Sequence, residues 1–180
     1  MARLLETGLD LLDAENTHGL TAVKGWNIIN GHLTEASDGA RFESRNPANK
    51  DDLLGNFPRS TKDDVHAALD AAHAALPGWA STPAPTRGQI IGNMARLLLD
   101  LKDDIVRLET REIGKTLKES GGEVQEAIDT CLFFQAEGRR LYGQTVHSEL
   151  PNKELSTYRR PLGVCAIINA SNFPAAVPFW

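Results

Sequence analysis

Hydrophobic residues recur at three- and four-residue spacing in three stretches of the chain, which is the pattern of helices with one buried face. The first stretch follows a predicted capping box at Ser60–Asp63 and is expected to stop at Pro77-Gly78. The second, from Thr86 to Gly114, predicts one extended helix or two helices in tandem. The third is expected to begin near Gly122 and to stop at Gly143. The chain is therefore predicted to be rich in helices.

Alternating and β-branched segments predict strands before and after these helices. Residues 26–45 are expected to form two short strands around turns at Asn30-Gly31 and Asp38-Gly39. Thr145 to Val146 and Leu155 to Tyr158 are predicted to pair as a two-stranded ribbon. The pattern therefore describes a chain of mixed helix and strand.

Val164 to Ile168 are consecutive apolar residues that follow Pro161 and Gly163. This run predicts a central strand of a parallel sheet, buried on both faces. Parallel neighbours need crossover connections of about a dozen residues or more, and no residue follows Trp180 in this sequence. We therefore expect part of a larger fold, which self-associates or needs a partner when it stands alone. For the same reason Ile167→Lys is expected to abolish soluble protein.

Charge and composition exclude several classes of partner. The formal net charge is -5 and no basic patch is interleaved with aromatic residues, so neither nucleic acid nor an anionic membrane is an expected partner. Residues 1–13 are interrupted by acids and do not form a signal peptide, and no later stretch approaches a membrane span. Cys131 and Cys165 both occupy predicted core positions, and two such thiols suggest a reducing compartment. A cytoplasmic location is expected.

The end of the chain resembles a known family. Arg159 to Ile168 followed by Asn172-Phe173-Pro174 is similar to the segment P-x-G-V-x-x-x-I-x-P-W-N-F-P of the NAD(P)-dependent aldehyde dehydrogenase superfamily. Ala170-Ser171 stands where that family has Pro-Trp, whereas Asn172 is retained. Further matches appear in the family's order at Asn30-Gly31, Ser44–Pro47, the helix starting near Thr61, Trp79, Arg87, Leu108–Lys115 and Glu123–Ile128. The resemblance covers about residues 25 to 180.

The resemblance implies the fold class α/β: an incomplete Rossmann-like cofactor domain of the aldehyde dehydrogenase fold, helix-rich, with a β-ribbon for oligomerisation. Residues 1–25, predicted as a short amphipathic helix and a loop, are an N-terminal extension. Residues 26–143 are the mainly helical N-terminal part of the cofactor-binding domain, and residues 144–160 are the ribbon, which in the family pairs with another subunit. Residues 161–180 are the first strand and turn of the cofactor-binding sheet, truncated.

The resemblance also assigns roles to residues near the end of the chain. It implies that the amide of Asn172 donates to the oxyanion formed when a cysteine thiolate attacks the aldehyde. Taken from the residues alone, Asn172 reads equally well as a turn asparagine that bonds its own backbone. Ile168, Asn169, Ala170 and Ser171 are implied to flank the cofactor, or else belong to ordinary strand-to-helix packing. Phe173, Val177 and Trp180 are implied to line the aldehyde tunnel, or else to be core.

Other candidate residues are predicted to have ordinary structural roles. Cys131 and Cys165 have no base near them in the sequence, so buried structural thiols are the favoured interpretation. His66 and His73 lie on one side of a helix without a pattern for a third ligand, so an exposed surface is expected and no metal. Glu112 aligns with a position that helps to bind a monovalent cation in some members, but a solvated helix-end acid is favoured.

The family's chemistry needs residues that this sequence does not contain. A cysteine in a G-Q-x-C context, a glutamate in an E-L-G-G context, and the lysine and Gly-rich turn that hold the cofactor are all absent. The expected parent enzyme oxidises an aldehyde to a carboxylic acid with NAD or NADP, through a cysteine thiohemiacetal. This chain alone is expected to be inactive and to bind the cofactor weakly or not at all. As alternatives, the chain is a shortened interaction module or half of a split enzyme. The expected partner is a second copy of the chain, in a homo-oligomer, or a complementary chain.

Overall fold

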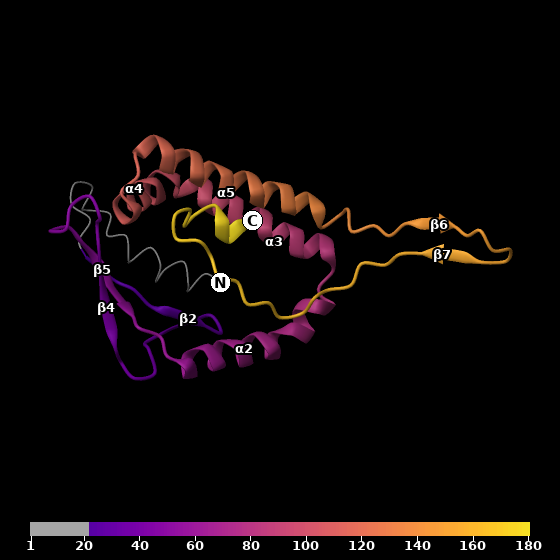
Figure 1. Ribbon diagram of the computed structural model, residues 1–180, viewed down its shortest axis with the longest axis horizontal. Coiled ribbons are helices and arrows are strands. Elements are labelled where there is room, and N and C mark those ends of the chain that lie inside the picture. Colours follow the sequence, from indigo (N-terminus) through magenta and orange to yellow (C-terminus); the bar gives the residue numbers. More distant parts are fainter. Residues whose placement is uncertain (1–21) are drawn as a thin grey trace. The chain divides into compact units, whose positions relative to one another are not determined.

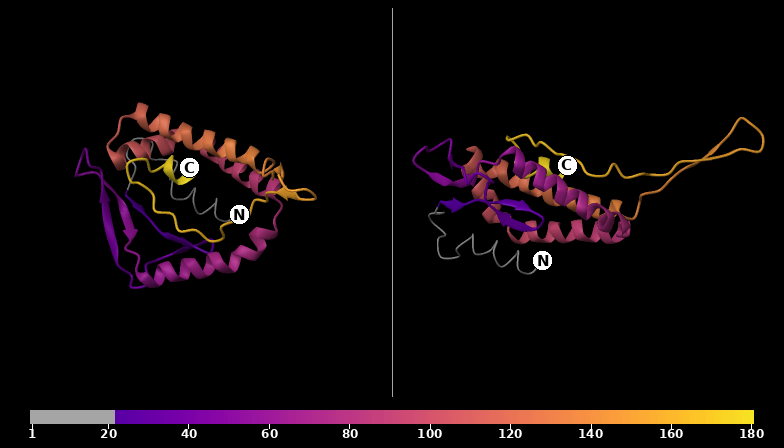
Figure 2. Two further views of the ribbon diagram at one scale, coloured as in Figure 1. Left: turned by 45° about the vertical axis from the view of Figure 1, so that its right-hand side comes forward. Right: turned by 90° about the horizontal axis from the view of Figure 1, so that it is seen from below.

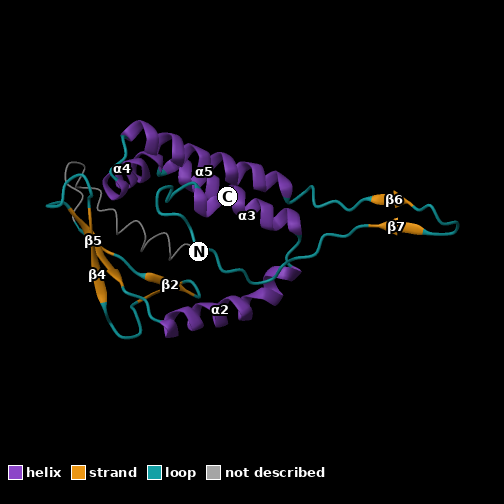
Figure 3. Cartoon of the chain, viewed as in Figure 1, coloured by secondary structure: helices purple, strands orange, loops and turns teal. Residues whose placement is uncertain are grey.

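The computed structural model describes residues 22–180 (Figures 1, 2 and 3). These residues divide into two compact units. The described part of the first unit comprises residues 22–75 and 106–120, and the second unit comprises residues 76–105 and 121–180. The elements are, in order, β1 (Val23–Lys24), β2 (Asn27–Ile29), β3 (His32–Thr34), β4 (Arg41–Arg45), β5 (Leu53–Pro58), α2 (Lys62–Ser81), α3 (Ala84–Asp100), α4 (Lys102–Ile113), α5 (Leu117–Glu137), β6 (Thr145–His147), β7 (Glu154–Ser156) and the 3₁₀ turn η1 (Val177–Phe179).

The first unit contains a three-stranded sheet in the order β1-β5-β4 and a separate hairpin, β2–β3. Strand β1 runs parallel to β5, and β4 runs antiparallel to it. The hairpin turns at Asn30 and Gly31, whose φ angles of 52° and 76° suit a tight two-residue turn. The turn predicted at Asn30-Gly31 is confirmed, but residues 26–45 hold three strands, β2, β3 and β4, rather than the two predicted. Val23 and Lys24 of β1 fall within the predicted extension, whose predicted helix lies outside the described residues.

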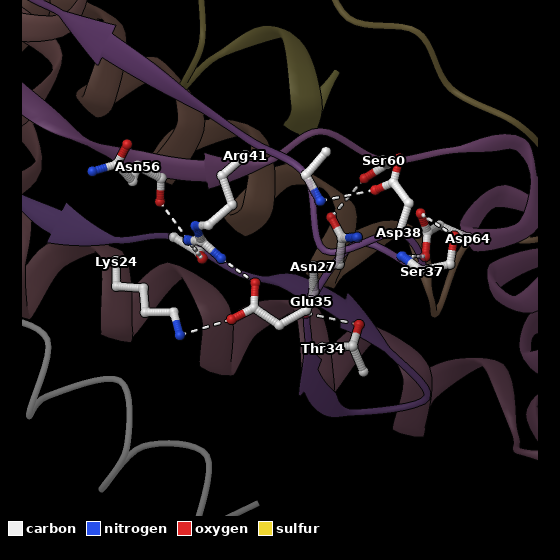
Figure 4. Close-up of polar contacts among 12 residues, drawn as sticks. Lys24, Asn27, Thr34, Glu35, Ser37, Asp38, Arg41, Asn56, Ser60 and Asp64 are labelled. Carbon is white, nitrogen blue, oxygen red and sulfur yellow. Dashed lines mark hydrogen bonds and ion pairs between the residues drawn. The ribbon is translucent and has the colours of Figure 1, made fainter.

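A polar network joins the strands of this unit (Figure 4). The Arg41 Nη2 donates to the backbone carbonyl oxygens of Gly25 and Asn56, at 2.6 and 2.5 Å, and its Nη1 pairs with Glu35. The Lys24 ammonium lies 2.7 Å from the same carboxylate and, with Arg41, holds the pKa of Glu35 below its ordinary value. Arg41 thus satisfies carbonyl groups from two segments of the sheet at once.

Helix α2 begins one residue later than predicted and continues past its predicted end. The capping pair is Thr61 and Asp64: the Thr61 Oγ1 accepts from the Asp63 N–H at 3.2 Å, and the Asp64 Oδ2 accepts from the Thr61 N–H at 2.7 Å. The helix does not stop at Pro77-Gly78 but extends to Ser81, with Pro77 inside it, although an interior proline loses a backbone hydrogen bond and crowds the carbonyl of the preceding turn.

The apolar stretch from Thr86 to Gly114 forms two helices in tandem, α3 and α4, which meet at Leu101. Gly114, with a φ of 77°, ends α4 as predicted. Helix α5 begins at Leu117 rather than near Gly122, because Thr116 and Glu119 form a capping box there. It ends at Glu137 rather than at Gly143, so its last predicted turn is not helical.

Helices α3 and α5 pack against each other in the second unit. A Cβ placed on Gly88 would lie 2.6 Å from the Gln135 carbonyl oxygen, so the two backbones are close there. Just beyond the other end of α3, the Lys102 ammonium donates to the Gln125 Oε1 at 2.6 Å, so the two contacts together show that α5 runs antiparallel to α3. The buried apolar side chains of this unit include Ala95 of α3 and Val124, Ala127, Ile128 and Cys131 of α5.

The predicted ribbon is confirmed: β6 and β7 pair antiparallel, with Thr145 opposite Ser156, and all their residues are exposed. Within the second unit the ribbon extends away from the end of α5 (Figure 1). The predicted strand from Val164 to Ile168 is not formed. That segment is irregular, and Ile167 and Ile168 are 73% and 98% exposed, because no described strand pairs with it.

No helix within residues 22–180 is both long enough and apolar enough to cross a membrane.

Candidate functional site

Asn172 lies in a turn that leads into η1, all within the second unit. The turn is closed by a backbone hydrogen bond of 3.2 Å from the Val177 N–H to the Phe173 carbonyl. Asn172 is exposed, and its side chain has no hydrogen-bond partner among residues 22–180. The side-chain amide therefore does not bond the turn's own backbone, and its N–H donors are available to an outside acceptor.

This turn is attached to α5 by the carboxylate of Glu123. Oε1 of Glu123 accepts hydrogen bonds from the N–H groups of Ala175 and Ala176, at 2.9 and 3.2 Å. Glu123 is 3% exposed and Ala176 is fully buried, so the attachment lies inside the unit. Sequence analysis missed this role of Glu123. The sequence does contain an indication of it: Glu123 lies one helical turn before Ala127, so a carboxylate stands on the apolar face of α5.

Two of the three residues predicted to line the aldehyde tunnel are brought together. The ring centroids of Phe173 and Trp180 are 6.4 Å apart and their planes are inclined by 34°. The two rings are 37% and 63% exposed, and Val177 between them is half-buried. They form an apolar surface on the segment that follows Asn172, and this surface is only partly covered within this chain.

The residues predicted to flank the cofactor do not form an enclosed site in this chain. Ile168, Asn169, Ala170 and Ser171 are all exposed, and none belongs to a helix or strand. A dinucleotide site needs a strand end facing a helix N-terminus. These four residues alone therefore do not fit such a cofactor.

Two segments that resemble the aldehyde dehydrogenase superfamily, Ser44–Pro47 and Leu108–Lys115, lie close together in the first unit. Arg111 of α4 donates from Nε and Nη2 to the two oxygens of Asp52, at 3.0 and 2.5 Å, and the Asn46 side-chain amide adds a bond of 3.0 Å. These hydrogen bonds, that from Arg111 foremost, lower the pKa of Asp52 to about 2. A Cβ on Gly114 would come within 3.1 Å of the Pro47 ring. These matched residues therefore have a structural role. Sequence analysis did not find Asp52, since nothing in the order of residues distinguishes it from Asp51.

The remaining candidates are scattered. Cys131 is buried and its burial raises the pKa of the thiol, in line with a structural thiol. Cys165 is exposed, which corrects its predicted core position and follows from the uncovered segment around it. His66 and His73 are exposed as predicted, and Glu112 is exposed as well. Within the described part of the chain, no group of three or more His, Cys, Asp or Glu side chains gathers as metal ligands would.

The sequence profile described as the aldehyde dehydrogenase family matches residues 33–180. The chain belongs to the aldehyde dehydrogenase family. It corresponds to an N-terminal portion of that family's fold, a mixed helix and sheet architecture of the cofactor-binding part.

Individual aldehyde dehydrogenases agree with this assignment. The chain is 40% identical over 150 residues to succinate-semialdehyde dehydrogenase [NADP(+)] GabD of Escherichia coli strain K12, covering 83% of this chain and 31% of the enzyme. It is 38% identical over 154 residues to alpha-ketoglutarate semialdehyde dehydrogenase of Haloferax volcanii, covering 86% and 32%. The crystal structure of succinate-semialdehyde dehydrogenase from Burkholderia pseudomallei superposes with a TM-score of 0.79 at 34% identity, covering 84% and 31%. The chain thus spans about a third of the length of the relatives it matches.

Proposed function

We propose that the chain forms the N-terminal part of an NAD- or NADP-dependent aldehyde dehydrogenase and supplies Asn172 as the oxyanion donor of that enzyme. Family membership over residues 33–180 supports the reaction class. The observation that carries the residue assignment is the exposed, unpaired amide of Asn172 on a turn held by buried Glu123. A donor fixed in advance stabilises negative charge that develops on the aldehyde oxygen during attack.

The chain contributes this donor but not the nucleophile. Burial raises the pKa of Cys131, so its thiolate is disfavoured at neutral pH. Cys165 is exposed in an irregular segment, and its sulfur lies 3.7 Å from the Gly163 carbonyl, which gives it no base. We therefore propose that the isolated chain does not oxidise aldehydes, and that the attacking cysteine and the general base come from the other part of the enzyme.

We propose a semialdehyde, an aldehyde that also carries a carboxylate, as the substrate class. The names of the E. coli and Haloferax volcanii relatives both specify such compounds. The exposed Phe173 and Trp180 would face the aldehyde end of this substrate, since Phe173 directly follows Asn172 and the Trp180 ring lies beside that of Phe173. We further place the enzyme in the cytoplasm, because both cysteines of the described chain are free thiols.

The test joins this chain to the remaining part of E. coli GabD and measures steady-state kinetics with succinate semialdehyde and NADP. Asn172→Ala should lower kcat by roughly 100- to 1000-fold with little change in KM, because the donor acts mainly in the transition state. Asn172→Asp is the matched variant: aspartate serves a turn as well as asparagine does, but its carboxylate cannot donate. Equal activity of Asn172→Asp and the unmutated fusion would show that Asn172 is only a turn residue.

A second function, half of a split enzyme or an interaction module, is favoured by the exposed ribbon and the exposed run up to Ile168. Mixing this chain with a separately expressed C-terminal part of GabD distinguishes the two. Restored activity supports a split enzyme, whereas stable binding without activity supports an interaction module. No binding would exclude both.

A further inference from the structure

Glu123 is a charged residue in an apolar setting. It lies on α5 beside Val124 and one turn before Ala127, both fully buried, and is itself 3% exposed. Removing a carboxylate from water is costly unless hydrogen bonds replace the lost solvation. Burying a leucine or alanine at this position would cost less free energy than burying a carboxylate. The contacts of the carboxylate must therefore account for its presence.

Among those contacts are the two N–H groups that follow Pro174. Oε1 of Glu123 accepts from Ala175 at 2.9 Å and from Ala176 at 3.2 Å, across 52 and 53 residues of sequence. Pro174 has no N–H, so these are the first backbone donors after Phe173. Hydrogen bonds to an ionised acceptor are among the stronger ones in proteins. One carboxylate oxygen therefore attaches this turn to the helix at two adjacent points.

The segment before the turn is not attached in this way. Ile168 is 98% exposed and residues 169–172 are exposed too, whereas Ala176 has no exposed surface. The turn therefore takes its position from α5, and not from the irregular segment that precedes it in sequence. Asn172 lies three residues before Ala175, so any movement of the anchor moves its amide.

We infer that Glu123 is the positioning residue for Asn172: its buried carboxylate fixes, through the Ala175 and Ala176 N–H groups, the turn that presents the Asn172 amide. This role rests on the proposed function of Asn172, since a turn without an oxyanion donor would need no such placement. Electrostatic stabilisation depends on donors that are already oriented when charge develops, and a buried anchor supplies that orientation.

The first experiment measures amide hydrogen exchange of Ala175 and Ala176 by NMR in the unmutated chain, in Glu123→Gln and in Glu126→Gln. Glu126 lies on the exposed side of the same helix and is the matched control. Glu123→Gln keeps the size but loses the charge, so both amides should exchange about 10-fold faster, while Glu126→Gln leaves them unchanged. Amides that are already unprotected in the unmutated chain, or protected equally in Glu123→Gln, would overturn the inference.

The second experiment places the same variants in the fusion with GabD. Glu123→Gln should lower kcat and leave KM for the aldehyde nearly unchanged, as Asn172→Ala does but by a smaller factor, about 10-fold. A normal kcat for Glu123→Gln beside a strongly reduced kcat for Asn172→Ala would overturn the positioning role alone. A normal kcat for Asn172→Ala would instead overturn the proposed function, and the exchange rates would still decide whether Glu123 holds the turn.

Discussion

Asp52 shows how a single carboxylate joins segments that are distant in sequence. Its carboxylate accepts hydrogen bonds from Nε and Nη2 of Arg111 and from the side-chain amide of Asn46. Its backbone N–H donates to the Asn49 carbonyl at 2.9 Å. Bidentate pairing of this kind is stronger and more specific in direction than a single contact. The side chains of Asp52 and Arg111 are only 23% and 20% exposed, so solvent screens the pair incompletely.

We predict that Asp52→Asn destabilises the chain by about 1 to 2 kcal/mol at pH 7, because the amide keeps the shape but loses the charge. The folded pKa of Asp52, about 2, lies below its ordinary value of 3.8. The stabilisation is therefore complete above about pH 4 and is lost as the pH falls toward 2. Urea unfolding at pH 7 and at pH 2.5 checks this. Asp51→Asn, at an exposed neighbour, is the control and should have almost no effect. An equal cost of Asp52→Asn at both pH values would contradict the prediction.

At the scale of elements, the contact between α3 and α5 depends on small residues. Gly88 and Gly92 lie one turn apart on α3 and are both buried where α5 approaches. A Cβ on Gly88 would lie 2.6 Å from the backbone oxygen of Gln135, and one on Gly92 would overlap the side-chain Oε1 of the same residue. The first obstacle is backbone and the second is the end of a flexible side chain.

This difference predicts opposite results for two alanine substitutions. Gly88→Ala should cost about 1 to 3 kcal/mol, because the helices must separate to relieve the clash. Gly92→Ala should be neutral or slightly stabilising, because Gln135 can swing away and alanine favours the helix by about 1 kcal/mol over glycine. Thermal unfolding of the two variants tests the pair. Equal destabilisation would mean that Gln135 cannot move.

At the scale of the whole molecule, the described chain leaves much apolar surface in contact with water. Leu162, Ile167 and Ile168 are 94%, 73% and 98% exposed, and the Trp180 ring adds to them. Exposed apolar runs of this kind mark association surfaces. The exposure of Ile167 also removes the buried strand on which the expectation for Ile167→Lys rested.

We predict that the chain self-associates at tens of micromolar through this run, as light scattering should show. Ile167→Lys should leave the chain soluble and shift it toward the monomer, because the lysine charge opposes apolar contact. Ile28→Lys, at an isoleucine of β2 that is 69% exposed, should not change the association state. A monomer in the unmutated chain would refute the association, and equal effects of the two variants would refute its location.

Features that depend on neighbouring residues could be read from the sequence alone. The glycine at the end of α4, the Asn30-Gly31 turn and the ribbon at 145–158 follow from local backbone preferences and periodicity. The predicted helix start was one residue early at α2, where Thr61 and Asp64 rather than Ser60 and Asp63 form the cap, and it was late at α5, where the capping box at Thr116 was not predicted. The resemblance to the aldehyde dehydrogenase superfamily, which predicted a role for Asn172, also follows from the order of residues in the sequence.

The sequence by itself thus determined the helices, the hairpin turn, the ribbon and the family, because these rest on local propensity and on an ordered series of motifs. Only the tertiary structure decided that Val164–Ile168 is uncovered, since a strand exists through its partners and none is described here. It also decided the roles of Glu123 and Asp52, whose donors lie 52 and 59 residues away. A buried carboxylate is explained by what reaches it in space, and periodicity along the chain carries no information about contacts at that separation.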